Sequence, residues 1–212
     1  MANLDLPKGL VPVSNLNGNP YSGGSWMCYV ASGYATALYV GDPVIHAGTA
    51  CTNGCCMTIG IATAGAGNQV LGAIVGFEPY GPDVAGWNAT LDATGIDRAG
   101  SLPYRAASTA RYANVCIDPD TIYEIQGDTD TALAYTTTSS NADLISGTGS
   151  TVTGKSGWEL DASSATTTLN LQLHILRAVN RPDNDVSLIH ADWLVLLNMS
   201  VFTGALGRVT GV

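Results

Sequence analysis

The sequence predicts an all-β protein whose body is a β-barrel or a β-sandwich, with an extended N-terminal arm and long loops. Apolar residues alternate with polar ones across residues 169–175, which is the period of a half-buried strand. Asp118-Pro119-Asp120 separates two β-prone runs, and both residue types favour chain reversal. The 25 glycines and the long serine and threonine tracts favour turns and strands over helices. We expect one β-rich domain over residues 26–212.

Residues 1–25 are predicted to form an arm. Prolines, asparagines and glycines interrupt any regular element in this segment. Its apolar side chains offer surface that could dock on a neighbouring protein, and these candidate contact residues are Leu10, Val11, Val13 and Tyr21. A frayed terminus is the alternative, because chain ends are often ordered only when bound.

Short strands separated by glycine-containing breaks are expected after the arm. The apolar runs that predict them are residues 26–31, 36–40, 43–46, 57–62, 70–77, 112–117 and 121–126. Residues 78–110 are rich in glycine and proline and are predicted to form a long loop. A loop of that length usually has a function or wraps a neighbour.

The C-terminal half is predicted to continue as strands. The Ser/Thr-rich segment 136–168 should hold two or three exposed strands and turns, anchored by apolar residues 142–145 and 158–160. The later alternation slips at Leu176-Arg177, where a β-bulge is expected because strict register would bury an unpaired arginine. Residues 192–202 are predicted as a strand buried on both faces, and residues 185–191 are a candidate short helix.

The charge balance excludes some partners. Eight basic and 17 acidic residues give a net charge of −9, so we expect no nucleic-acid partner. No stretch approaches the roughly 20 apolar residues of a membrane span, and no secretory pattern is present, which predicts synthesis in the host cytoplasm and no membrane partner. Because only 12% of residues are charged, we expect surface hidden by self-association, as a trimer or dimer, or by a larger assembly.

Five cysteines are predicted to be mostly reduced, buried thiols: Cys28, Cys51, Cys55, Cys56 and Cys116. A disulfide or cross-link through Cys51, Cys55 or Cys56 is the alternative. His46 with these three cysteines could be taken for a zinc site, but adjacent cysteines on a strand point in opposite directions and seldom reach one metal.

Acidic turn residues are the remaining candidates for chemistry. Asp118 and Asp120 could form the carboxylate pair of a glycoside hydrolase, and Asp128-Thr129-Asp130 could contribute oxygen ligands to calcium. Turn aspartates are far commoner, however, and no nucleophile-elbow motif occurs. The three histidines are far apart in sequence, and His174 is expected on the polar side of its strand. We therefore predict a non-enzymatic protein with no catalytic, cofactor-binding or metal-binding residues.

Several sequence blocks, taken in their order and spacing, resemble head decoration or capsid cement proteins of tailed bacteriophages. They are Gly41-Asp-Pro-Val44, Val70-Leu-Gly-Ala-Ile-Val-Gly-Phe-Glu-Pro79, Tyr104-Arg-Ala-Ala-Ser-Thr-Ala-Arg-Tyr112, Val115-Cys-Ile-Asp-Pro-Asp120, Tyr123-Glu-Ile-Gln126, Asn141-Ala-Asp143, Gly147-Thr-Gly-Ser-Thr151, Ser156-Gly-Trp-Glu-Leu-Asp161, Leu171-Gln-Leu173, Asn180-Arg-Pro-Asp-Asn184 and Trp193-Leu-Val195.

The resemblance spans residues 41–198 and contains no catalytic signature. It implies a β-rich body, usually oligomeric, that binds the outer surface of the shell formed by the phage major capsid protein. Such a protein would lie on the capsid exterior of the virion and resist the pressure of packaged DNA. The cysteine-bearing residues 51–56 are not part of the resemblance.

A carbohydrate- or receptor-binding β module of a virion is the alternative function. Trp26, Trp87 and Trp158 could stack on sugars, although tryptophans are more often core anchors. Paired exposed aromatic residues on one face would favour this alternative. A polysaccharide hydrolase that uses Asp118 or Asp120 is a further alternative.

Overall fold

The structure, a computed structural model, describes residues 3–50, 56–78, 102–203 and 211. Within these residues it contains eleven strands, one short 3-10 helix and no α-helix, which confirms the predicted all-β class. The elements are β1 (Val11–Asn15), β2 (Trp26–Val30), β3 (Pro43–Ala50), β4 (Met57–Ile61), β5 (Gly72–Phe77), β6 (Arg111–Cys116), β7 (Thr121–Gln126), η1 (Tyr135–Thr137), β8 (Asn141–Ile145), β9 (Glu159–Thr166), β10 (Leu173–Ala178) and β11 (Asp192–Leu197).

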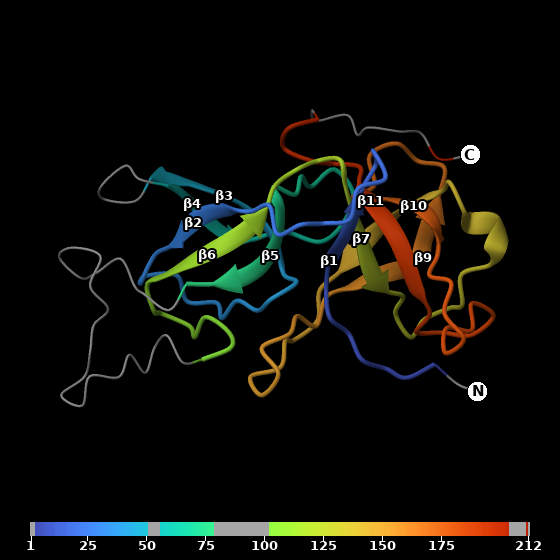
Figure 1. Cartoon of the computed structure of the whole chain (residues 1–212), viewed down its shortest axis with the longest axis horizontal. Helices are drawn as coiled ribbons and strands as arrows, with labels where there is room; N and C mark the ends of the chain where they lie inside the picture. Colours follow the sequence, from blue (N-terminus) through green and yellow to red (C-terminus); the bar gives the residue numbers. More distant parts are fainter. Residues whose placement is uncertain (1–2, 51–55, 79–101, 204–210, 212) are drawn as a thin grey trace.

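One half of the molecule is a closed five-stranded barrel in the order β2-β4-β3-β5-β6 (Figure 1). The neighbouring strands are antiparallel except for β2 and β4, which pair in parallel at Tyr29 and Thr58. Side chains alternate between the two faces of a strand, so every second residue of β6 points into the barrel. The interior is apolar and contains Cys28, Val30, Val44, Ile59, Ile74, Ala113 and Val115.

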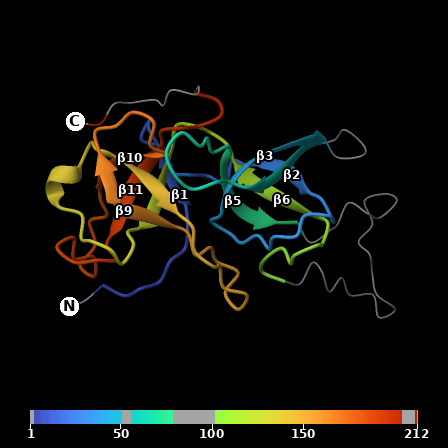
Figure 2. The same ribbon diagram turned by 180° about the vertical axis from the view of Figure 1, so that it is seen from behind.

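The other half is a six-stranded sheet in the order β1-β7-β11-β10-β8-β9, which lies beside the barrel (Figure 2). This sheet curls strongly, because β9 returns to the end of β7. Gly127 and Leu160 form an isolated bridge there, and the Asp128 N–H donates to the Leu160 carbonyl at 3.0 Å. The enclosed core contains Tyr123, Ile125, Leu144, Leu160, Leu173, Ile175, Trp193 and Val195.

The two halves share one apolar cluster. Val70, Ala73 and Cys116 from the barrel side belong to the same buried cluster as the interior of the sheet. At the junction the chain passes close to itself: a Cβ on Gly41 would lie 2.1 Å from the Lys8 carbonyl oxygen. Gly41 also has a φ of +96°, so a larger residue there would be strained as well as crowded.

Gln172 fastens the loop before β5 to the sheet. Its side chain is fully buried, and its amide Nε2 donates to the carbonyls of Thr63 at 2.9 Å and Asn68 at 3.2 Å. Its Oε1 accepts the N–H groups of Gly65 at 2.9 Å and Leu144 at 3.2 Å. All the usual hydrogen-bonding positions of the amide are therefore occupied.

This arrangement corrects the expectation that the polar residues of 169–175 face solvent. Asn170 is exposed, but Gln172 is buried and His174 is nearly so, with its Nδ1 2.7 Å from Asn141 Oδ1. Gln172 is covered because the sheet packs against the loop of residues 62–68, whereas His174 bonds Asn141 of the neighbouring strand β8. Polar residues at such positions are satisfied by hydrogen bonds to protein groups rather than to water.

Two buried arginines hold the segment around the predicted 78–110 loop, of which residues 79–101 lie outside the described residues. Arg111 donates to the carbonyls of Glu78 at 3.0 Å and Leu102 at 2.9 Å, at the two ends of that segment. Arg105 is fully buried, and its guanidinium bonds main-chain oxygens. It donates to the carbonyls of Thr109 at 2.6 Å, Thr36 at 2.6 Å and Ala31 at 2.8 Å.

Most of the expected strands are present, and the predicted bulge is confirmed. The register between β10 and β11 shifts between Ile175 and Arg177, which leaves Arg177 exposed. Two further expectations were wrong: residues 36–40 make only isolated bridges, and residues 185–191 form turns instead of a helix. In the Ser/Thr-rich segment the apolar anchors Ala142, Leu144, Trp158 and Leu160 are buried as expected, but β8 also buries the polar Asn141 and Asp143.

The N-terminal segment runs extended but lies against its own body. Residues 11–15 form β1, which pairs with β7 as an edge strand of the sheet. Leu10 is fully buried in the core, so it is not available as a contact residue for another protein. Val11, Val13 and Tyr21 are half-buried and remain partly accessible.

Candidate functional site

A surface depression lies between β1, β2 and the turn that precedes β7, and two exposed aromatic side chains line it. We call this depression the aromatic groove; its volume is about 490 Å³. Trp26, at the start of β2, is 62% exposed, and Phe202 is 54% exposed. The apolar lining residues are Tyr21, Trp26, Ile117, Pro119 and Phe202, and the polar ones include Asn15, Ser22, Ser25, Asp118 and Thr121.

Local hydrogen bonds position one wall of the aromatic groove. Tyr21 donates its N–H to the Val13 carbonyl at 3.0 Å and its hydroxyl to the Gly24 carbonyl at 2.9 Å. The chain between β1 and β2 therefore folds back on β1. Burial, with a contribution from Cys116, raises the pKa of Tyr21 to about 12, so this phenol remains neutral and can act as a donor at neutral pH.

The Asp118-Pro119-Asp120 turn forms another wall, as its sequence predicts. Asp118 Oδ1 accepts the Asp120 N–H at 2.9 Å, and the Asp118 carbonyl accepts the Thr121 N–H at 3.1 Å. Both aspartates are exposed, and Asp118 borders the groove. One carboxylate oxygen of Asp118 thus stabilises the turn, which is the common role of aspartate at this position.

The cysteine and tryptophan candidates separate into three groups. Cys28 and Cys116 are buried thiols, as predicted, and burial raises the pKa of Cys28 to about 11. Cys56 is half-buried, whereas Cys51, Cys55 and Trp87 lie outside the described residues. Trp158 is a core residue, so of the three tryptophans considered for sugar binding, the described part of the chain exposes Trp26.

A second depression of about 540 Å³ borders the N-terminal segment and contains an ionic cluster. Lys8 Nζ lies 2.5 Å from Glu124 Oε1 and 3.0 Å from Asp192 Oδ1, and Arg181 pairs with the same two carboxylates. Burial alone would raise the pKa of Glu124, but the hydrogen bonds and charges of Lys8 and Arg181 outweigh it and lower that pKa. The cluster fixes the N-terminal segment on β7 and β11.

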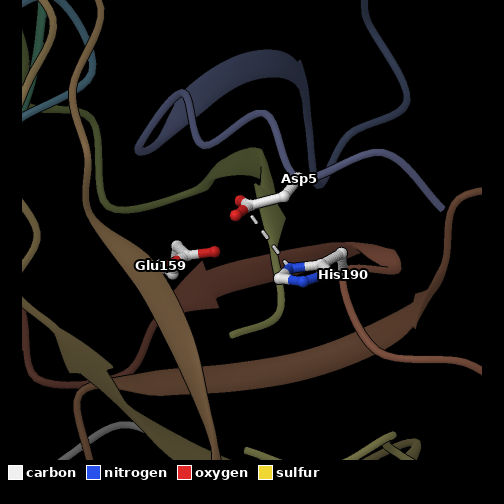
Figure 3. A group of neighbouring side chains, drawn as sticks. All are labelled: Asp5, Glu159 and His190. Carbon is white, nitrogen blue, oxygen red and sulfur yellow. Dashed lines mark ion pairs between the residues drawn. The ribbon is translucent and has the colours of Figure 1, made fainter. Parts of the chain in front are cut away.

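Three further ionisable side chains meet beside this depression (Figure 3). Asp5, Glu159 and His190 each place one potential metal-ligating atom within 4.8 Å of the others. Burial, then the charges of Asp5 and Asp128, raise the pKa of Glu159 to about 7. Sequence spacing gives no indication of this group, because its members come from the N-terminal segment, β9 and the turn before β11. None of the three is among the metal-ligand candidates that the sequence suggested.

Neither the known protein families, nor curated proteins, nor solved structures provided a match to this chain. No helix in the described ranges has the length and apolar character needed to cross a membrane.

Proposed function

We propose that the protein is a structural virion component that binds the outer surface of a mature phage capsid and stabilises it. The observation that carries the proposal is the aromatic groove, because Trp26 and Phe202 leave more than half of their surfaces exposed on it. Tryptophan is among the residues most enriched at the energetic centre of protein interfaces. Exposed apolar patches on a folded chain commonly mark such interfaces.

The composition supports the same proposal. A charged fraction of 12% is about half of the usual share, so the chain has little charge with which to cover a free surface. Surface that is buried against a shell or against other copies of the chain does not need to be covered by charged side chains. The sequence resemblance to decoration proteins supports the phage major capsid protein as the partner, with self-association as a trimer or dimer.

Stabilisation would follow from mass action. A protein that binds the mature shell, and does not bind its immature or dissociated form, shifts the equilibrium toward the mature shell. Each contact need not be strong, because many copies act on one particle. Burying roughly 100 Å² on each exposed ring would contribute about 2.5 kcal/mol per ring to the gross interaction.

Co-sedimentation with bare mature heads tests this function. Trp26→Ala should weaken binding by about 2 kcal/mol, which is about 30-fold, because it removes the most exposed aromatic ring of the groove. Tyr135→Ala is the matched control, since Tyr135 is 73% exposed on η1, at the far end of the other half of the molecule (Figure 1). Equal binding of the wild type and the two variants would reject the groove as the contact surface.

A carbohydrate- or receptor-binding module is the second candidate function. The pair of exposed aromatic rings next to Asp118 and Asn15 favours it, because sugars stack on aromatic faces and hydrogen-bond to neighbouring polar groups. A glycan array discriminates the two functions. Glycan binding that Trp26→Ala abolishes, without co-sedimentation with heads, would support this candidate instead.

A further inference from the structure

The group formed by Asp5, Glu159 and His190 contains buried polar atoms that lack the partners such atoms require. Among the described residues, Glu159 Oε1 and His190 Nδ1 are buried and make no hydrogen bond. The His190 side chain is only 10% exposed, and Nδ1 faces Asp5, with 3.8 Å between Nδ1 and Oδ1 (Figure 3). A buried polar group without a partner is costly, so it indicates a ligand or ion.

In the described part of the chain, the carboxylates around these atoms also lack paired cations. Asp128 is 4% exposed, its Oδ2 has no hydrogen-bond partner, and its N–H donates to the carbonyl of Leu160, the residue next to Glu159. The nearby cations Lys8 and Arg181 are committed to Glu124 and Asp192. Within the described ranges, no lysine or arginine pairs with Glu159 or Asp128. When Glu159 is ionised, the site therefore has an excess of negative charge that a bound cation would balance.

The buried side-chain amide of Gln126 connects two of the segments that form the site. Gln126, the last residue of β7, is 4% exposed and bonds the main chain on both sides of Asp5. Its Oε1 accepts the Leu6 N–H at 2.9 Å, and its Nε2 donates to the Leu4 carbonyl at 2.9 Å. The same Nε2 donates to the His190 carbonyl at 3.1 Å. A single residue thus holds the main chain that carries two of the three side chains.

The conformation of His190 supports the same interpretation. Its φ is +60°, a value that is uncommon for residues other than glycine. The hydrogen bond from Gln126 and the turn before β11 hold this conformation, and the imidazole is directed toward Asp5 and Glu159 (Figure 3). Uncommon backbone conformations persist where the surrounding structure enforces them, and they concentrate at functional sites.

We propose that Asp5, Glu159 and His190 bind a divalent transition-metal ion, with zinc as the best match, and that this ion fastens the N-terminal segment to β9 and to the turn before β11. Zinc accepts an imidazole nitrogen together with carboxylate oxygens, and three protein ligands leave a fourth position for water. Calcium and magnesium prefer ligand sets made of oxygen alone. The site does not depend on the proposed capsid function.

Binding requires a modest closure of the site. Zinc bonds of about 2.0–2.2 Å in tetrahedral geometry place ligand atoms about 3.3 Å apart, whereas the three atoms here lie within 4.8 Å. Asp5 can supply part of this movement, because its side chain is 59% exposed. The ion would connect three segments that are distant in sequence, so the N-terminal segment should be more firmly held with metal than without it.

Thermal melting of the metal-free full-length protein with added Zn²⁺, Ca²⁺ or Mg²⁺ tests the proposal. The protein should carry Cys51→Ser, Cys55→Ser and Cys56→Ser, so that thiols do not compete for zinc. We expect Zn²⁺ to raise the Tm by about 5–10 °C at 100 times its Kd, and we expect little response to Ca²⁺ or Mg²⁺. Co²⁺ bound in place of Zn²⁺ should give visible d–d absorption bands. It should give no thiolate-to-metal charge-transfer band, because the ligands are an imidazole and two carboxylates.

Two variants assign the response to this site. Glu159→Gln and His190→Asn should each lower zinc affinity at least about 100-fold, since even indirect partners of a metal cost 10–100-fold. Asparagine tolerates the positive φ of position 190. Without metal, Glu159→Gln should melt no lower than the parent, because it removes a buried unpaired carboxylate, so a lost response would not reflect misfolding. His46→Asn is the control with an unchanged response. No Tm change with Zn²⁺, or an undiminished change in both variants, would overturn the proposal.

Discussion

Replacing Gln172 with methionine should strongly destabilise the protein, although the strand pattern alone assigns this residue to a solvent-facing position. Methionine has a similar length but cannot bond to the four main-chain groups that Gln172 satisfies, those of Thr63, Gly65, Asn68 and Leu144. A net loss of about 1 kcal/mol for each group gives about 4 kcal/mol in total. For a chain of this size, the Tm should fall by about 8–16 °C.

Asn170→Met is the matched control for this experiment. Asn170 occupies the same side of the alternating pattern two residues earlier, but its side chain is exposed. Its replacement should change the free energy of unfolding by less than about 0.5 kcal/mol. Urea unfolding of the two variants and the wild type measures both effects. Similar stability of Gln172→Met and Asn170→Met would refute the assignment of Gln172 as the connection between the loop and the sheet.

Three further predictions concern buried ionisable groups. Arg105→Met should lose about 2–4 kcal/mol in urea unfolding, because three carbonyls lose their donor, whereas exposed Arg177→Met should lose less than about 0.5 kcal/mol; equal losses would contradict this role of Arg105. Burial raises the pKa of Asp42 from 3.8 to about 6, so its contribution to stability is complete below pH 3.8 and declines as the pH rises to 6. Relative to Asp42→Asn, the wild type should therefore lose about 3 kcal/mol over that interval, and parallel stability curves would argue against a raised pKa. Cys28, whose pKa is about 11, should be alkylated at pH 8 only after unfolding, as mass spectrometry of the native and the denatured protein would show; rapid native labelling would disprove its burial.

Local sequence patterns predicted the strands well where one physical signal dominated. The limits of β7 follow from the turn signals on both sides of it, and the bulge in β10 follows from the cost of burying Arg177. Residues 36–40 have the apolar character of a strand, yet Leu38 and Val40 bridge only to Arg105 and Lys155, which are distant in sequence. Strand formation requires a paired neighbour, which a local pattern does not reveal.

The functional features were harder to predict, because they depend on contacts between distant segments. The aromatic groove joins the segment before β2, the turn before β7 and residues after β11. The sequence suggested Trp26 as a residue that could stack on sugars, but nothing in the sequence brings Phe202 beside the same groove. Asp5 and His190 likewise come together through long-range contacts, among them the hydrogen bonds of Gln126 to the N-terminal segment and to the turn before β11.

Thermal melting of bare mature phage heads, with and without saturating amounts of the purified protein, tests the proposed capsid function most directly. If the protein binds the mature shell preferentially, the melting temperature of the heads should rise with protein concentration, and Trp26→Ala should require about 30-fold more protein for the same rise. An unchanged melting temperature together with no co-sedimentation would contradict the proposal.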